Sequence, residues 1–224
     1  MDVRKILAKE HTAEQVSALW TAYHATLSQG TGRGYLSATI PLKTYLKMIS
    51  MAAKYPTFLL PLLRPSQETQ EVAHEFYLLQ WAFHEIPPHP SQTPSLPFRD
   101  QVWSPSISAK PNPACSTVLF TPLQEYKLRQ TFAQPYLVLT HYSDLATTHG
   151  IVLLRGDITP SSSSAVKYLM SQSDAQLLAF GVQQFYLASG TDNSERRVEL
   201  LRKFHEKPKE FQWEELLASG HPTS

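Results

Sequence analysis

TFLLPLLR (residues 57–64) and EFYLLQWAFHE (residues 75–85) are two apolar, aromatic-rich runs joined by a polar connection. Runs of this length and composition are typical of buried strands, and the short connection favours antiparallel pairing. Pro61 lies inside the first run and has no backbone N–H to donate, so this strand is expected at a sheet edge or at a bulge. The two runs therefore place an antiparallel sheet at the centre of the fold.

Strand-like composition recurs along the chain, in runs separated by turns or helical patterns. The further predicted strands are residues 35–40, 115–121, 135–142, 150–158 and 183–188. Their hairpin-like spacing predicts an α+β fold with two layers, in which helices cover a largely antiparallel, twisted sheet of about six strands.

The first helix has the clearest local signal. Thr12 and Gln15 have the spacing of a capping box, in which each side chain binds a free backbone N–H. Apolar side chains then recur at helical spacing, at Val16, Leu19, Trp20, Tyr23 and Leu27. A second helix is expected from Pro41 to the break at Tyr55 and Pro56. A third long helix is expected to begin at an N-cap among Ser161–Ser164 and to run to about Phe180. Shorter helices are expected over residues 122–132, 195–204 and 213–219.

The length of 224 residues favours one domain, residues 1–224. Residues 86–113 hold eight of the 17 prolines, with Ser, Gln and Thr between them. Such a segment buries too little apolar surface to offset its ordering entropy. We therefore expect a mobile, proline-rich insertion on the surface of the domain.

The charge balance excludes several classes of partner. The formal net charge is +1 and the pI is about 7.9, without the basic bias of nucleic-acid-binding proteins. No apolar run approaches the ~18 to 20 residues of a membrane-spanning helix, so no membrane insertion is expected. The single cysteine, Cys115, cannot form an internal disulfide, which fits a reducing compartment.

A search for catalytic chemistry finds no complete motif. No histidine pair has the HxxxH spacing of a zinc-protease helix, and prolines directly after Ile86 prevent one at His84. His141, Ser143 and Asp144 are too close in sequence for a triad, which needs groups from different elements. We therefore expect no catalytic residues, no metal and no cofactor.

Aromatic and apolar side chains are in surplus on the first helix and on the first two runs. Core packing explains most such residues. Where they are exposed together, they mark a protein-binding surface instead.

Eight fragments, taken in order, carry a resemblance to a known family. They are EQVSALWTAYHA (14–25), KYPTFLLPL (54–62), EFYLLQW (75–81), FTPLQEYK (120–127), LVLTHYSDL (137–145), HGIVLLRGDI (149–158), VQQFYL (182–187) and FHEKPKEFQW (204–213). The chain resembles the mitochondrial ATP synthase assembly chaperone family from about Thr12 to Leu217, except at the proline-rich insertion.

The resemblance implies a monomeric holdase, without nucleotide turnover, for the soluble catalytic sector of the ATP synthase. It would bind the unassembled catalytic beta subunit until alpha replaces it, in the mitochondrial matrix. The absence of a transit peptide would then mean that the chain is processed, with this segment removed, or truncated.

For the client site we hypothesise a surface built from the aromatic surplus: Trp20, Tyr23, Phe58, Leu59, Leu60 and Trp81. Two alternatives stay open, an adaptor that presents the proline-rich insertion and a hydrolase that works through His141 or Cys115. A deep pocket with converging polar groups would favour the enzyme. A shallow apolar face would favour the chaperone.

Overall fold

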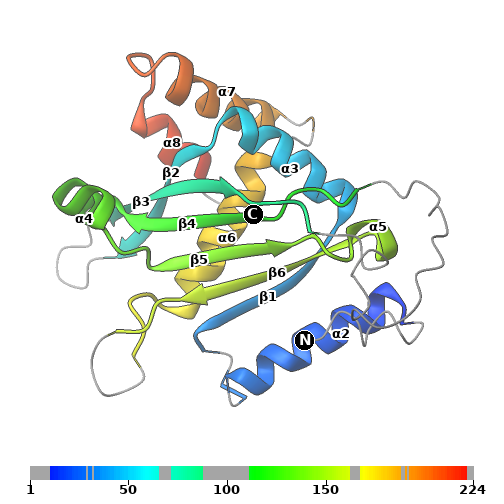
Figure 1. Ribbon diagram of the computed structural model, residues 1–224. Coiled ribbons are helices and arrows are strands. Elements are labelled where there is room, and N and C mark those ends of the chain that lie inside the picture. The colour runs from blue at the N-terminus through cyan, green and yellow to red at the C-terminus, as the bar shows by residue number, and fades with distance from the viewer. Residues whose placement is uncertain are drawn as a thin grey trace.

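The computed structural model describes residues 11–28, 30–31, 33–65, 72–87, 111–161, 167–187, 190 and 192–220. Its centre is a six-stranded sheet in the order β1-β6-β5-β4-β3-β2, with every neighbouring pair antiparallel (Figure 1). The strands are β1 (Tyr35–Pro41), β2 (Thr57–Pro65), β3 (Val72–Phe83), β4 (Ser116–Pro122), β5 (Leu137–Tyr142) and β6 (Ile151–Ile158). The α+β class expected from the sequence is confirmed.

The strand order places β1 and β2 at opposite edges of the sheet. Strands β2 to β6 are neighbours in chain order, whereas β1 pairs with β6, the last strand. Helix α3 (Leu42–Lys54) joins β1 to β2 and therefore has to cross the face of the sheet. Its buried side chains, Tyr45, Met48 and Ala52, lie three to four residues apart and so form one stripe against the sheet.

The larger core lies between the sheet and α3, α6 (Gln172–Tyr186), α7 (Asp192–Glu206) and α8 (Trp213–Gly220). Alternate residues of each strand point into it, because side chains of a strand alternate between faces. On β2 these residues are Phe58, Leu60 and Leu62, and on β3 they are Tyr77, Leu79 and Trp81. Full burial of one such side chain stabilises the fold by about 1.5–3 kcal/mol.

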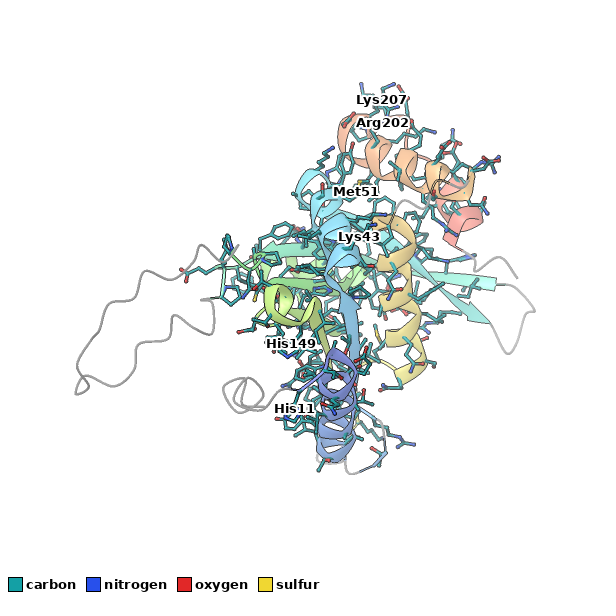
Figure 2. The ribbon with its side chains drawn as sticks, turned by 90° about the vertical axis from the view of Figure 1, so that its right-hand side faces the viewer. His11, Lys43, Met51, His149, Arg202 and Lys207 are labelled. Atoms are coloured by element: carbon teal, nitrogen blue, oxygen red, sulfur yellow. The ribbon has the colours of Figure 1, made fainter. Side chains whose placement is uncertain are left out.

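Helix α2 (Ala13–Leu27) packs at the β1/β6 side of the sheet, far from α7 in Figure 2. The expected capping box is present, with Thr12 and Gln15 binding each other's backbone N–H. Val16 and Trp20 form a second, smaller core with Ile151 and Leu153 of β6. The indole Nε1–H of Trp20 donates to the carbonyl of Leu154 at 2.9 Å, so this side chain is held by packing and by a hydrogen bond.

Short helices fill the connections between the later strands. Helix α4 (Leu123–Arg129), continued by the 3₁₀ turn η2 (Gln130–Phe132), joins β4 to β5, and α5 (Ala146–His149) joins β5 to β6. Both connections agree with the expected antiparallel pairing. Residues 88–110 of the expected insertion lie outside the described part of the chain.

Two sequence expectations are wrong, and both concern α6. The N-cap is Ser171, whose side chain accepts from the N–H of Asp174, and not a residue of 161–164. The expected strand at 183–188 is instead the end of this helix. Val182 and Phe185 continue the helical stripe begun by Leu178, so packing against the sheet decides between helix and strand here.

Candidate functional site

Among the strands that the structure describes, none pairs with one side of the β2 backbone. The N–H of Trp81 donates to the carbonyl of Pro56 at 2.7 Å, which fixes the alternation of the β2–β3 ladder. The backbone groups of even-numbered β2 residues therefore point to β3, and those of odd-numbered residues point to the free side. Pro61 is odd-numbered, so its missing N–H removes no ladder bond, as its expected edge position requires.

One end of this free side is already occupied. His205 of α7 places Nε2 at 2.6 Å from the carbonyl oxygen of Thr57. Beyond Thr57, no hydrogen bond to the outward backbone groups of Leu59, Pro61 or Leu63 exists within the described residues. From Leu59 to Leu63, two N–H donors and three carbonyl acceptors of this edge therefore have no hydrogen-bond partner among the described residues, although α8 also packs against β2; we call this stretch the open edge.

Beside this edge lies a shallow apolar groove between β2 and α6, which we call the edge groove. Its volume is only about 80 Å³, well below the roughly 300–1,000 Å³ of a typical ligand pocket. Three large apolar side chains at it are 44–50% exposed: Leu63, Leu177 and Phe180. The remaining lining residues are Leu60, Pro61, Leu62, Leu178, Gly181, Gln184 and Phe185.

Gly181 explains how α6 comes so close to β2. A Cβ at this position would meet Cδ1 of Leu60 at 2.9 Å, which is shorter than real Cβ contacts. Glycine inside a helix costs about 1 kcal/mol relative to alanine, and here the cost is offset by the close approach of helix and strand. The floor of the edge groove is thus built into the packing of the fold.

The six residues of the client-site hypothesis fall into two separate groups. Trp20 and Tyr23 lie on α2 at the β1/β6 side, whereas the other four lie on β2 and β3 at the opposite edge. The structure does not bring the two groups together. Of the six, Trp20, Phe58, Leu60 and Trp81 are buried, Leu59 is half-buried, and Tyr23 is 39% exposed.

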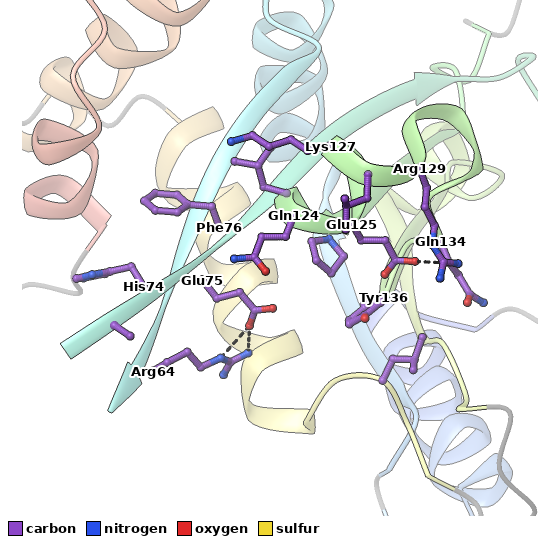
Figure 3. Close-up of a pocket in the computed structure, with 15 residues that line it drawn as sticks. Arg64, His74, Glu75, Phe76, Gln124, Glu125, Lys127, Arg129, Gln134 and Tyr136 are labelled. Carbon is purple, nitrogen blue, oxygen red and sulfur yellow. Dashed lines mark hydrogen bonds and ion pairs between the residues drawn. The ribbon is translucent and has the colours of Figure 1, made fainter. Parts of the chain in front are cut away.

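A cleft of about 840 Å³ lies between the end of the β2–β3 hairpin and α4 (Figure 3). Four of its charged side chains are in ion pairs: Arg64 contacts Glu75 at 2.7 Å and also Asp174 of α6 at 2.8 Å, and Arg129 lies 3.6 Å from Glu125. Burial raises the pKa of Tyr136 at this cleft, so its phenol stays neutral near pH 7. These pairs connect β2, β3 and α6 and have an evident structural role.

His141, the candidate base of the hydrolase alternative, is part of a buried network. Its ring stacks on Trp81 at 5.6 Å, and Nδ1 lies 3.0 Å from Oγ of Ser116. Burial lowers the pKa of His141 to about 4. Oγ of Ser143 instead donates to the carbonyl of Pro113 at 2.6 Å and lies 3.4 Å from Sγ of Cys115. His141 and Ser143 therefore do not form a nucleophile–base pair.

The described residues contain no group of three or more His, Cys, Asp or Glu side chains that could hold a metal ion. None of their helices is both long and apolar enough to cross a membrane.

Sequence reasoning missed Leu63, Leu177 and Phe180, which form the exposed part of the edge groove. Leu177 and Phe180 lie beside the buried stripe of α6, one position from Leu178 and one from Gly181. The glycine in mid-helix was the available signal, because it indicates the close approach of another backbone or side chain.

Comparison with known proteins identifies the family to which the chain belongs. The family described as ATP11 protein matches residues 1–217. The chain is 33% identical over 205 residues to "Protein atp11, mitochondrial" of Schizosaccharomyces pombe, covering 91% of this chain and 55% of that protein. It is 26% identical over 212 residues to "ATP synthase mitochondrial F1 complex assembly factor 1" of Homo sapiens, covering 95% and 48%.

A relative of the same name from Danio rerio is 25% identical over 205 residues, covering 92% of this chain and 50% of that protein. The chain thus spans about half the length of these relatives. The family match includes all eight fragments on which the sequence resemblance depends. The chain belongs to the ATP11 protein family.

Proposed function

We propose that this protein is an assembly chaperone for the F1 sector of mitochondrial ATP synthase. It holds the unassembled catalytic beta subunit until the alpha subunit replaces it, acts in the mitochondrial matrix and performs no catalysis. The names of the relatives support the assembly role and the mitochondrial location. The resemblance of the sequence fragments supports the choice of the beta subunit.

The observation that carries the proposal is the open edge of β2 beside the edge groove. An extended segment of the client adds to the sheet as a seventh strand, bonded to Leu59, Pro61 and Leu63. Its alternate apolar side chains then cover Leu177 and Phe180 of α6. An unassembled subunit exposes such apolar segments, and covering them prevents aggregation.

The size of this surface suits a chaperone that has to release its client. The open edge is five residues long, and each new hydrogen bond contributes only about 1 kcal/mol net. A shallow groove adds limited apolar burial. The resulting affinity is weak enough for a larger, permanent interface to displace the chaperone.

The test is co-expression with the ATP synthase beta and alpha subunits, followed by size-exclusion chromatography. The wild-type protein should co-elute with beta, and adding alpha should release it. The double variant Leu63→Lys/Phe180→Lys should lose the complex, because charges at the edge groove would be desolvated on binding. Both side chains are about half exposed, so melting temperature should change little.

The matched control replaces one leucine and one aromatic residue of α2 by lysine, Leu19→Lys/Tyr23→Lys, where the side chains are similarly exposed. This variant should still bind beta. Loss of binding only in the control would move the client site to α2, as the original hypothesis for Tyr23 allows. No complex of the wild-type protein with beta would contradict the proposed function itself.

A further inference from the structure

Helix α3 carries a stripe of positive charge on the side away from the sheet. Lys43, Lys47 and Lys54 are separated by four and seven residues, so they project from one side of the helix. With a rise of 1.5 Å per residue, the stripe is roughly 16 Å long. The helix has no acidic residue in its sequence, LKTYLKMISMAAK, so the charge of this stripe is not balanced within α3.

The stripe lines a groove of about 830 Å³, which we call the α3 groove. Its apolar lining includes Leu46, which is 44% exposed, and Met51, and Figure 2 shows Lys43 and Met51 on this side of the molecule. The remaining lining residues are Leu42, Ser50 and Tyr186. Cationic and apolar side chains therefore share one concave surface, and no carboxylate is among the described residues that line it.

The three lysines differ from those of the neighbouring C-terminal helices. Lys203 binds Glu215 at 3.0 Å, and Lys207 binds Glu210 at 3.3 Å. By contrast, within the described ranges no Asp or Glu oxygen lies within 4 Å of the lysine ammonium groups of α3. The α3 groove thus has three cations available to a partner.

We propose that the α3 groove binds an acidic amphipathic helix of a partner protein. Carboxylates spaced four and seven residues apart on such a helix would face Lys43, Lys47 and Lys54. Its apolar side would cover Leu46 and Met51, as in helix-in-groove recognition. Charge complementarity sets the orientation and the register of the bound helix.

The surroundings of the groove favour a helix over an anionic membrane. Tyr55, next to Lys54, donates its hydroxyl to Glu206 of α7 at 2.9 Å, and Glu206 lies 4.0 Å from Arg202, so charges of both signs border one end of the stripe. The positive charge is thus confined to the narrow stripe of α3 and is combined with apolar side chains in one groove. A single amphipathic helix about 10 Å wide matches this arrangement better than a broad, flat anionic surface.

This site is separate from the proposed client site. The α3 groove and the edge groove share no lining residue, so both can be occupied at once. The inference therefore does not depend on the proposed function, and the two are tested with different variants.

The probe is a labelled 18-residue amphipathic peptide with Glu at positions 3, 7 and 14 and leucines on the adjacent stripe. Its binding to the full chain is measured by fluorescence anisotropy at low salt. The variant Lys43→Gln/Lys47→Gln/Lys54→Gln should bind at least about tenfold more weakly, and added salt should weaken wild-type binding. A peptide with Gln in place of Glu should not bind measurably.

The control variant Lys127→Gln/Lys167→Gln/Lys209→Gln makes the same change in net charge at exposed positions elsewhere. It should bind the peptide as the wild type does. Equal weakening in both triple variants would overturn the proposal, since the effect would then come from net charge. Lysine-dependent binding to phosphatidylserine vesicles, with no binding to the peptide, would also overturn it.

Discussion

The buried imidazole of His141 links the stability of the fold to pH. The unfolded chain protonates this residue near pH 6.5, whereas the folded protein does so only near pH 4, because burial disfavours the charged ring. Below pH 6.5 the unfolded state therefore binds the proton more tightly, and stability is lost as the pH falls from 6.5 towards 4. The full loss from this group is about 3 kcal/mol.

Urea unfolding at pH 7, 5.5 and 4.5 tests this expectation. The variant His141→Gln is expected to be less stable at pH 7 but to lose less stability on acidification. His84→Gln, which changes an exposed histidine, serves as the control and should keep the wild-type pH dependence. An unchanged pH dependence in His141→Gln would show that other groups cause the acid sensitivity.

The aromatic residues of α2 show why the client site could be predicted only in part. Val16, Trp20 and His24 form one row at a spacing of four and are buried, whereas Leu19, Tyr23 and Leu27 form the adjacent row and are exposed. From composition alone, the row of Leu19, Tyr23 and Leu27 would be expected to be the buried one, because the other row contains a histidine. His24 is nevertheless buried, with its ring against Trp20 at 4.3 Å and Nδ1 at 2.9 Å from the carbonyl of Trp20.

At the scale of the element, Pro61 protects the edge of β2. It lies in the apolar run TFLLPLLR and removes one outward N–H from the open edge. The variant Pro61→Val should fold, because residue 61 makes no ladder bond through its N–H. It should also self-associate, since a continuous apolar edge can pair with a second copy.

Analytical ultracentrifugation over a range of concentrations tests this prediction for Pro61→Val. Adding Leu63→Lys to the same variant is expected to restore the monomer, because an edge lysine blocks strand pairing. If Pro61→Val stays monomeric at every concentration, the edge is protected by something other than the proline.

The elements themselves were predicted with unequal success. The six strands follow from dense apolar runs bounded by turns, which are local signals, and the edge position of β2 follows from Pro61. The end of α6 does not, because VQQFYL contains Val, Phe and Tyr, which favour strands, while Val182 and Phe185 also fit a helical stripe. Only the contacts of Phe185 with Phe58 of β2 distinguish the two, and these depend on the tertiary fold.

For the whole molecule, the strand order decides which surfaces can act together. Trp20 and Phe58 belong to opposite sides of the sheet because β1 pairs with β6, and no local pattern contains that pairing. The same reason explains why the edge groove was not predicted. It forms where β2 and α6, more than a hundred residues apart in the chain, pack side by side.

The proline-rich segment that we expect to be an insertion connects β3 to β4 at a point where a shorter linker can replace it. Phe83 of β3 pairs with Ser116 of β4, and the N–H of His84 donates to the carbonyl of Cys115 at 2.9 Å. The two strands are therefore adjacent where residues 88–110 depart, and a short Gly/Ser linker can join them. A shorter connection costs slightly less loop-closure entropy, so the melting temperature should stay the same or rise by a few degrees.

Size-exclusion chromatography with the beta subunit should still show a complex for the linker variant. Loss of the complex with the melting temperature unchanged would favour the adaptor alternative, in which the insertion is the ligand. Circular dichroism of the variant provides the control that the fold is intact.

The pairing of β1 with β6 also has a consequence for how the chain folds. Tyr35 pairs with Asp157, so β1 is made early and finds its neighbour only after most of the chain exists. Strands β2 to β5 pair through near neighbours, whereas closing the β1–β6 ladder requires a contact of very long sequence separation, which is slow. A protein that we propose to shelter an unfinished subunit must therefore keep one of its own strands unpaired until late in its folding.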